Sequence, residues 1–391
     1  MNALQFFISL NSMKFSNYRN YSALIFCIIV LISMSGCFHE EGDKGIIADN
    51  KAPSIADIET LSSSIKLIPV PKECMIGNIM YSKSYGDMIF LFDEGLRKIH
   101  CFENGTPCFT LDKVGRGPED YIGIGAFTYI QDSRELVIFE REKRLLKYYS
   151  IDSGGLQRKM EIPFYANAME YLKDGEFLFI RETDKQGNTP AVCLYSTYEG
   201  TVRTILPLRD DQAEMTTDFS FTKKCDSVFF GISSYSTALY SFRANLTEEK
   251  TIYFESNALD KNYWSGEFDE RKEEILTNAI VSGKDIALAP SFLNTNKTAL
   301  SFWYINAMGQ AHSTPPMNLC IIDKSEAVVY SNVRCLSLGV QNLQPIGVYG
   351  SGYVSLLFLD MIKPKQGTTL GDDVLRMREM GLDTALMVYE L

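Results

Sequence analysis

The strongest constraint on the fold is a repeat of short apolar strands separated by turn residues. The most apolar strand of each unit lies roughly 40–55 residues after the previous one, except across one longer gap, and these strands centre near residues 88, 137, 178, 229, 302 and 355. A four-stranded unit that recurs at about 40–50 residues is typical of a β-propeller blade. Six units fit the length, so the sequence predicts an all-β chain that forms a six-bladed β-propeller over residues 59–391.

The first unit shows the pattern most clearly. Residues 86–93 form an apolar strand, and residues 97–102 alternate between apolar and polar side chains. Asn104-Gly105 follows, a pair that favours a tight hairpin turn, and residues 107–111 form the next strand. Antiparallel strands joined by short turns are therefore expected throughout this region.

The ends of the repeat predict how the propeller closes. The sixth unit reaches the end of the chain with only three strands, and Ile65–Val70 is an unassigned strand before the first unit. Pairing this early strand with the last blade would cover an exposed sheet edge. A pair of β-sandwiches is the competing fold, but it would need a linker near the middle, and no segment there is rich in Gly, Pro or Ser.

Two helices are expected within the repeat. In the long gap between blades four and five, apolar residues recur at helical spacing over residues 268–283, which predicts a helical insertion at about 260–288. A shorter helix, from about Asp373 to Met380 with Gly381 after it, is expected within blade six.

The first 36 residues have the order of a secretory signal. Lys14 and Arg19 precede an apolar run of about 12 residues, at 23–34, which is shorter than the roughly 20 that a membrane-spanning helix needs. Ser35-Gly36-Cys37 then resembles a bacterial lipobox, which implies lipidation of Cys37. An uncleaved short anchor is the alternative, and either Met1 or Met13 could be the true start.

Residues 37–58 are expected to form a flexible acidic tether between the lipid and the propeller. The acidic stretch at residues 40–43 resembles the surface-export signal of lipoproteins in Bacteroides-like bacteria. The expected location is the outer membrane, at the cell surface, with its periplasmic face as the alternative. A solvated linker would have the same composition.

Charge and cysteine content limit which partners, disulfides and metal sites are expected. The formal net charge is −11, which argues against nucleic acid as a partner. Besides Cys27 in the signal and Cys37, the chain has seven cysteines at irregular spacing: Cys74, Cys101, Cys108, Cys193, Cys225, Cys320 and Cys335. Most lie in apolar strands, so we expect buried free thiols rather than a disulfide framework. The absence of a CxxC pair argues against a structural zinc site.

The most distinctive local sequence is Val114–Tyr121, which joins the first unit to the second. Its Gly115-Arg-Gly-Pro-Glu-Asp-Tyr121 core resembles a segment at the blade junctions of the six-bladed, TolB-like and NHL-like propeller lipoproteins that are abundant in Bacteroides, with Asp120 where Glu is usual. The resemblance implies fold more than function. Either the segment locks neighbouring blades together, or Arg116, Glu119, Asp120 and Tyr121 contact a ligand.

No catalytic set is recognisable. His39, His100 and His312 lack a second histidine at metal-site or triad spacing, and no GxSxG or Walker motif occurs. We predict neither catalytic residues nor metal ligands, although calcium or another divalent cation in the channel stays open. Asp210-Asp211 and Asp372-Asp373 are interpreted as turn or helix-capping residues.

A binding or scaffold module is therefore the expected function. Tyr263 and Trp264, in the insertion, form a candidate exposed contact for a glycan or peptide. Two alternatives stay open: a lyase or hydrolase that uses channel carboxylates with a metal ion, and a subunit of an envelope protein complex that docks through the insertion.

Overall fold

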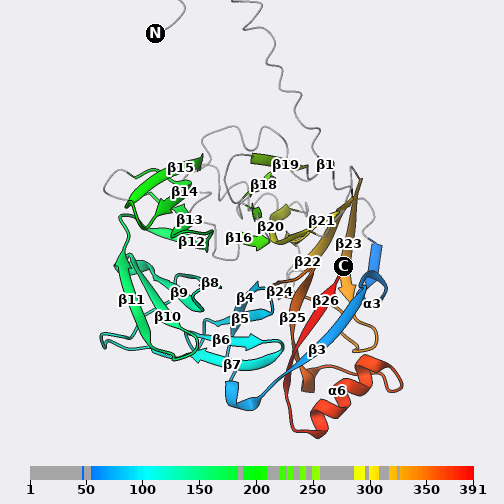
Figure 1. The fold of residues 1–391 in the computed structure, drawn as a ribbon. Coiled ribbons are helices and arrows are strands. Elements are labelled where there is room, and N and C mark those ends of the chain that lie inside the picture. Colours follow the sequence, from blue (N-terminus) through cyan, green and yellow to red (C-terminus); the bar gives the residue numbers. More distant parts are fainter. Residues whose placement is uncertain are drawn as a thin grey trace, which may run out of the picture. The chain divides into compact units, whose positions relative to one another are not determined.

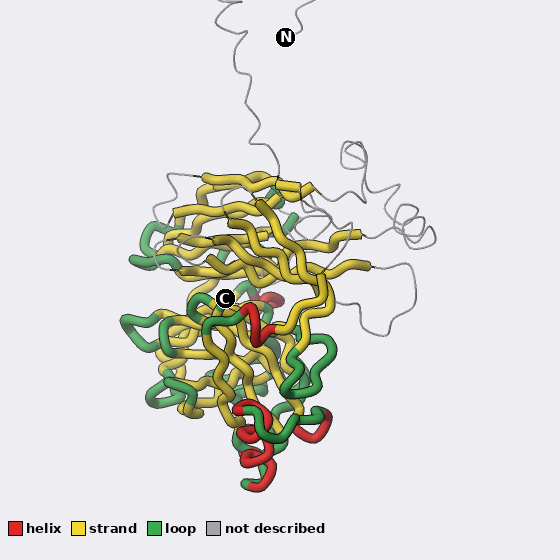
Figure 2. The backbone as a smooth tube through the Cα atoms, turned by 90° about the vertical axis from the view of Figure 1, so that its right-hand side faces the viewer, coloured by secondary structure: helices red, strands yellow, loops and turns green. Residues whose placement is uncertain are grey.

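The computed structural model describes the β-rich part of the chain. It covers residues 46–47, 54–183, 188–208, 221–224, 227–231, 238–243, 249–255, 286–295, 299–307, 317–323 and 326–391. Strands dominate this part and helices are few (Figure 2). No helix within the described ranges is long and apolar enough to span a membrane. The expected signal and lipidation site, and residues 260–285 of the expected helical insertion, lie outside these ranges.

The first three blades are antiparallel four-stranded sheets that follow one another along the chain. Blade 1 contains β4 (Ile79–Tyr85), β5 (Met88–Asp93), β6 (Lys98–Glu103) and β7 (Thr106–Leu111). Blade 2 contains β8 (Ala126–Ile130), β9 (Glu135–Glu140), β10 (Leu145–Ser150) and β11 (Leu156–Glu161). Blade 3 contains β12 (Ala166–Tyr171), β13 (Glu176–Arg181), β14 (Ala191–Ser196) and β15 (Thr201–Pro207).

Three more sheets complete the propeller. Blade 4 contains β16 (Phe221–Lys224), β17 (Ser227–Gly231), β18 (Ala238–Arg243) and β19 (Glu249–Glu255). Blade 5 contains β20 (Ile286–Thr295), β21 (Ala299–Ala307), β22 (Met317–Asp323) and β23 (Glu326–Arg334). Blade 6 contains β24 (Pro345–Tyr349), β25 (Gly352–Phe358), β26 (Thr384–Glu390) and β3 (Ser64–Val70). The predicted six-bladed architecture is confirmed.

The expected closure is also confirmed. β3, from near the start of the described chain, pairs antiparallel with β26 along its whole length, from Ser64 opposite Glu390 to Val70 opposite Thr384 (Figure 1). At the inner edge, β24 of blade 6 meets β4 of blade 1 in parallel, with Gly347 opposite Ser82. The outer edge of blade 6 is thus covered by a strand from the other end of the chain.

The segment expected as a flexible tether contains regular structure at its end. β1 (Ile46–Ile47) pairs in parallel with β19, and β2 (Ser54–Asp57) pairs in parallel with β23. The short helix α3 (Ile58–Leu61) follows, capped by the Asp57 side chain, with Ile58 fully buried. The two strands of this segment therefore add to the outer edges of blades 4 and 5, before β3 joins blade 6.

Hairpin turns follow the chemistry expected from the sequence. Asn104 and Gly105, between β6 and β7, have φ values of 52° and 78°, and Asp174 and Gly175, between β12 and β13, have 48° and 74°. Two successive positive φ values are what a type I′ turn requires, and this turn matches the twist of the strands that it joins. The short turns let each strand pair with the next one.

The helix in blade 6 is longer than expected. α6 runs over Thr369–Glu379, because the Thr368 hydroxyl accepts the Gly371 N–H and begins the helix four residues before Asp373. Asp372 therefore lies in the first turn rather than at the cap, and its carboxylate accepts the Gly367 N–H at 3.0 Å. The described residues also form three 3₁₀ turns: η1 (Lys72–Cys74), η2 (Arg141–Lys143) and η5 (Leu359–Met361).

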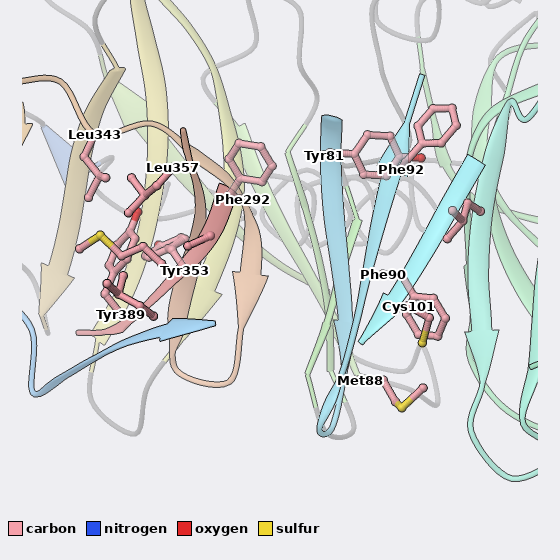
Figure 3. Packing of buried hydrophobic residues seen from close by; sticks show 14 of the residues in the cluster. Tyr81, Met88, Phe90, Phe92, Cys101, Phe292, Leu343, Tyr353, Leu357 and Tyr389 are labelled. Atoms are coloured by element: carbon pink, nitrogen blue, oxygen red, sulfur yellow. The ribbon is translucent and has the colours of Figure 1, made fainter. Parts of the chain in front are cut away.

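Aromatic side chains fill the space between blades. Tyr81 of β4 stacks on Phe127 of β8 with ring centroids 5.6 Å apart, and Trp303 of β21 meets Tyr353 of β25 edge-on at 6.0 Å. One buried cluster includes residues from blades 1 and 6, among them Phe90 and Tyr353 (Figure 3). Edge-to-face and offset ring pairs add stability beyond the burial of their area.

Candidate functional site

A cavity of about 610 Å³ lies where the six inner strands converge. Its lining includes residues from β4, β8, β12, β16, β20 and β24, and from the turns that follow β4, β8, β12 and β24. Charged residues and tyrosines contribute to this lining: Lys83, Tyr85, Tyr129, Asp132, Glu170, Tyr171 and Tyr198. The cavity is therefore a central pocket at the end of the channel where the inner strands finish.

An ion pair between two blades forms part of the cavity wall. Lys83 Nζ of β4 lies 3.5 Å from Glu170 Oε2 of β12, and the two side chains are only 6% and 2% exposed. The Lys83 ammonium also donates to the carbonyl oxygens of Phe127 at 2.8 Å and Met169 at 3.0 Å. One lysine of blade 1 thus binds the inner strands of blades 2 and 3.

Hydroxyl groups hold the Glu170 carboxylate in place. Tyr85 donates to Glu170 Oε2 at 3.1 Å, and the Thr128 hydroxyl donates to Oε1 at 3.0 Å. Thr128 in turn accepts the backbone N–H of Tyr171 at 3.1 Å. Each carboxylate oxygen has a donor with good geometry, which a buried charge requires.

Tyrosines supply much of the remaining wall. Burial raises the pKa of Tyr129 to about 12 and also raises the pKa of Tyr171. Both phenols are therefore neutral near pH 7, and the Tyr129 ring, which is only 2% exposed, packs against Phe90 with centroids 4.9 Å apart. At the mouth, Tyr198 is 82% exposed, and the exposed Asp132 lies near it along the cavity lining.

This combination suits a polar ligand with apolar faces. Flat aromatic surfaces and a few fixed polar groups are the usual lining of small-molecule sites. Among the described residues, no group of three or more His, Cys, Asp and Glu could hold a metal ion. The expectation for a divalent cation stays a prediction.

The Val114–Tyr121 segment lies at the other end of the inner strands. It precedes the start of β8, whereas Gln131 and Asp132 at the cavity follow the end of that strand. Five residues of strand separate the two sites by roughly 15 Å at about 3.3 Å per residue. The cavity and this segment are therefore different candidate sites.

Contacts within the segment fit the expectation that it locks blades. Tyr121 is fully buried, and its hydroxyl donates to the carbonyl oxygens of Arg97 at 2.7 Å and Leu111 at 3.1 Å. The Tyr149 hydroxyl of blade 2 donates to the Glu119 carbonyl at 2.7 Å. Tyr121 therefore fastens the segment to blade 1, and Tyr149 fastens it to blade 2.

Charged side chains of the segment differ in their accessibility. Asp120 Oδ2 accepts the Gly117 N–H at 2.8 Å, and Glu119 pairs with Lys113 at 2.8 Å on the surface. Arg116 is exposed. A ligand role for Arg116 and Glu119 stays a prediction, while the contacts of Asp120 and Tyr121 are those of a folded turn.

Other predicted positions fall in two groups. Cys37, Tyr263 and Trp264 lie outside the described residues, as do His39 and His312. His100 lies within β6 with 1% of its surface exposed, as expected for a core histidine.

Lys83, Tyr85 and Glu170 are not among the site residues that the sequence predicts. A usable signal was present, because Lys83 and Glu170 are charged residues inside segments that otherwise read as buried inner strands. Buried charges are uncommon unless they are paired. Pairing them required knowing that β4 and β12 converge on one channel.

Comparison with known families decides the classification. The family model described as 6-bladed beta-propeller (DUF5128) matches residues 41–350. The chain belongs to this six-bladed β-propeller family. Its model spans β1 through β24, and the match agrees with the blades described above.

A solved structure shows the same fold at low sequence identity. A "putative exported protein" from Bacteroides fragilis aligns with a TM-score of 0.60 and 14% identity, over 86% of this chain and 99% of its own. A member of the DUF4221 family from Bacteroides vulgatus aligns with a TM-score of 0.49 and 10% identity, over 84% and 96%. No curated protein matches the chain.

Proposed function

We propose that this protein is a lipid-anchored binding module outside the cytoplasm, which holds a polar ligand in the central cavity. The single observation that carries the proposal is the cavity lined by all six inner strands, with the buried Lys83–Glu170 pair in its wall and tyrosines around it. Ligands of propellers bind at the loops around the central channel. An oligosaccharide or a short peptide has the mixture of apolar faces and hydrogen-bonding groups that this lining matches.

The location in this proposal rests on the N-terminal sequence. A signal-like segment and Ser35-Gly36-Cys37 support lipidation of Cys37, and the acidic residues at 40–43 support export to the cell surface. The Bacteroides fragilis structure described above, a "putative exported protein", supports a location outside the cytoplasm, and the resemblance to TolB-like and NHL-like lipoproteins supports the anchor. Palmitate labelling of the intact protein, lost in Cys37→Ala, tests the anchor, and protease shaving of intact cells tests the surface location.

Ligand binding is tested with the full-length protein in detergent on glycan and peptide arrays. Tyr198→Ala removes an exposed ring at the cavity, so it is expected to leave the fold intact and weaken binding of any array hit about tenfold, which corresponds to about 1.4 kcal/mol.

Arg116→Ala is the matched control at the other end of the inner strands, and Trp264→Ala tests the insertion. Unchanged binding in both variants is expected. Binding lost in Arg116→Ala or Trp264→Ala but kept in Tyr198→Ala would place the ligand away from the cavity and contradict the proposal.

A further inference from the structure

Two cysteines of blade 1 lie in contact across neighbouring strands. Cys101 of β6 and Cys108 of β7 have their sulfur atoms 3.1 Å apart, and the Cys108 thiol also lies 3.5 Å from the Cys101 carbonyl oxygen. Cys101 is buried and Cys108 is exposed. Among the described cysteines, these two are the ones in contact with each other.

The hairpin explains this proximity. Asn104-Gly105 forms the turn, so Glu103 pairs with Thr106 and Phe102 with Pro107. The register then shifts, and Cys101 pairs with Phe109. Cys108 is therefore the extra residue of a β-bulge, beside Cys101.

Strand geometry permits a bond between these sulfurs. The two sulfur atoms lie 3.1 Å apart, about 1 Å more than the roughly 2.05 Å length of a disulfide bond. The two thiols already point at each other, so a bond requires small side-chain rotations.

We propose that Cys101 and Cys108 form a disulfide that fastens the outer strand β7 to β6 in blade 1. This inference shares the extracytoplasmic location with the proposed function, because disulfides persist in oxidising compartments. It is independent of the ligand. The described cysteines are free thiols, as the sequence predicts, and the proposal concerns what Cys101 and Cys108 form on oxidation; Cys193, Cys320 and Cys335 are buried.

The oxidation proceeds by thiol–disulfide exchange with the disulfide of an oxidoreductase or of a small molecule. The exposed Cys108, as thiolate, attacks one acceptor sulfur, which forms a mixed disulfide and releases the other acceptor sulfur as a thiolate. Cys101 then attacks Cys108 Sγ and releases the second acceptor thiolate. The protein loses two electrons and two protons, and the acceptor is reduced to two thiols.

Two features indicate what the bond does and how it forms. β7 is the outermost strand of its sheet, and alternate residues along it are exposed, so its attachment depends on the ladder that the bulge interrupts. Burial raises the pKa of both thiols, so the thiolate is scarce at neutral pH and catalysed exchange is favoured.

Differential alkylation of the full-length protein taken from acid-quenched cells tests the bond. Under denaturing conditions, Cys193 and Cys320 are expected to react with the first reagent, while Cys101 and Cys108 react only with the second reagent, added after reduction. The linked peptide is expected to lack two hydrogens. Reaction of Cys101 and Cys108 with the first reagent would overturn the proposal.

A second measurement uses the purified protein and oxidised glutathione. Oxidation is expected to raise the Tm by about 3 °C, as estimated for a closed loop of about eight residues in a domain of this size. Cys108→Ser is expected to abolish this rise, and Cys74→Ser, the control, to keep it. No bond in the oxidised wild-type protein would overturn the proposal and leave the proposed function standing. Retention of the protein in the cytoplasm would overturn the proposed function, and the glutathione result would still decide the disulfide.

Discussion

The Tyr121 hydroxyl offers a direct test of how blade 1 is joined to blade 2. Tyr121→Phe removes one oxygen from a fully buried side chain and keeps its ring, including the edge contact with Tyr149 at 6.4 Å. The change deletes two hydrogen bonds and leaves the carbonyl oxygens of Arg97 and Leu111 without this donor. A buried group that loses its partner costs about 1–3 kcal/mol, so we expect a loss of about 2 kcal/mol.

The assay is thermal unfolding followed by circular dichroism. With an unfolding entropy of about 2.1 cal/mol/K per residue and about 340 residues in the domain, 2 kcal/mol lowers the Tm by roughly 3 °C. Tyr198→Phe is the matched control and is expected to leave the Tm unchanged, because Tyr198 is 82% exposed. An unchanged Tm in Tyr121→Phe would refute the role assigned to its hydroxyl.

Three further perturbations test the rest of the domain. Gly347→Ala should lower the Tm strongly, because the added Cβ would overlap the Ser82 carbonyl oxygen. Gly123→Ala is the control and should leave the Tm unchanged, because nothing lies within 4 Å of its added Cβ. Equal effects on the Tm would contradict the close approach of β24 and β4. Ile68→Ala should cost about 2–5 kcal/mol in urea unfolding, because β3 buries this side chain in a cluster with residues of blades 6 and 1, and a cost near zero would contradict the closure. Burial lowers the pKa of His100 in the folded protein. Below about pH 6.5, the imidazole therefore binds a proton in the unfolded state but not in the folded state, and the folded protein loses stability as the pH falls. His100→Gln should therefore reduce the difference in Tm between pH 7 and pH 5, and an undiminished difference would assign it to other groups.

Local sequence carries most of the information about this fold. Asn104-Gly105 adopts the expected turn, and Ile65–Val70 finds the expected partner in β26, because an unpaired strand and an incomplete blade leave few ways to close the propeller. The sequence pattern predicts that α6 begins at about Asp373, whereas Thr368 caps the helix and it begins at Thr369.

The cavity could not be derived in the same way. Lys83 and Glu170 are distant in sequence, and each alone reads as a polar interruption of a strand. Their pairing follows from the convergence of inner strands from different blades, which no local pattern encodes. The distinctive Val114–Tyr121 segment lies at the opposite end of the inner strands, where its residues hydrogen-bond to neighbouring blades.

The proximity of Cys101 and Cys108 is predictable in part from the sequence. Cys101 and Cys108 are equally distant from the Asn104-Gly105 turn, so a regular hairpin would already place them opposite each other. The number of cysteines in the whole chain does not indicate this pairing, because the total is odd and the spacing is irregular.

Hydrogen–deuterium exchange of the full-length protein, with and without an oligosaccharide or peptide identified on the arrays, tests the central claim most directly. The account predicts slower exchange on ligand binding in peptides that cover residues 82–86, 129–132 and 170–174, which line the cavity, and unchanged exchange in 112–125. Protection confined to 112–125, with no change at the cavity, would contradict it.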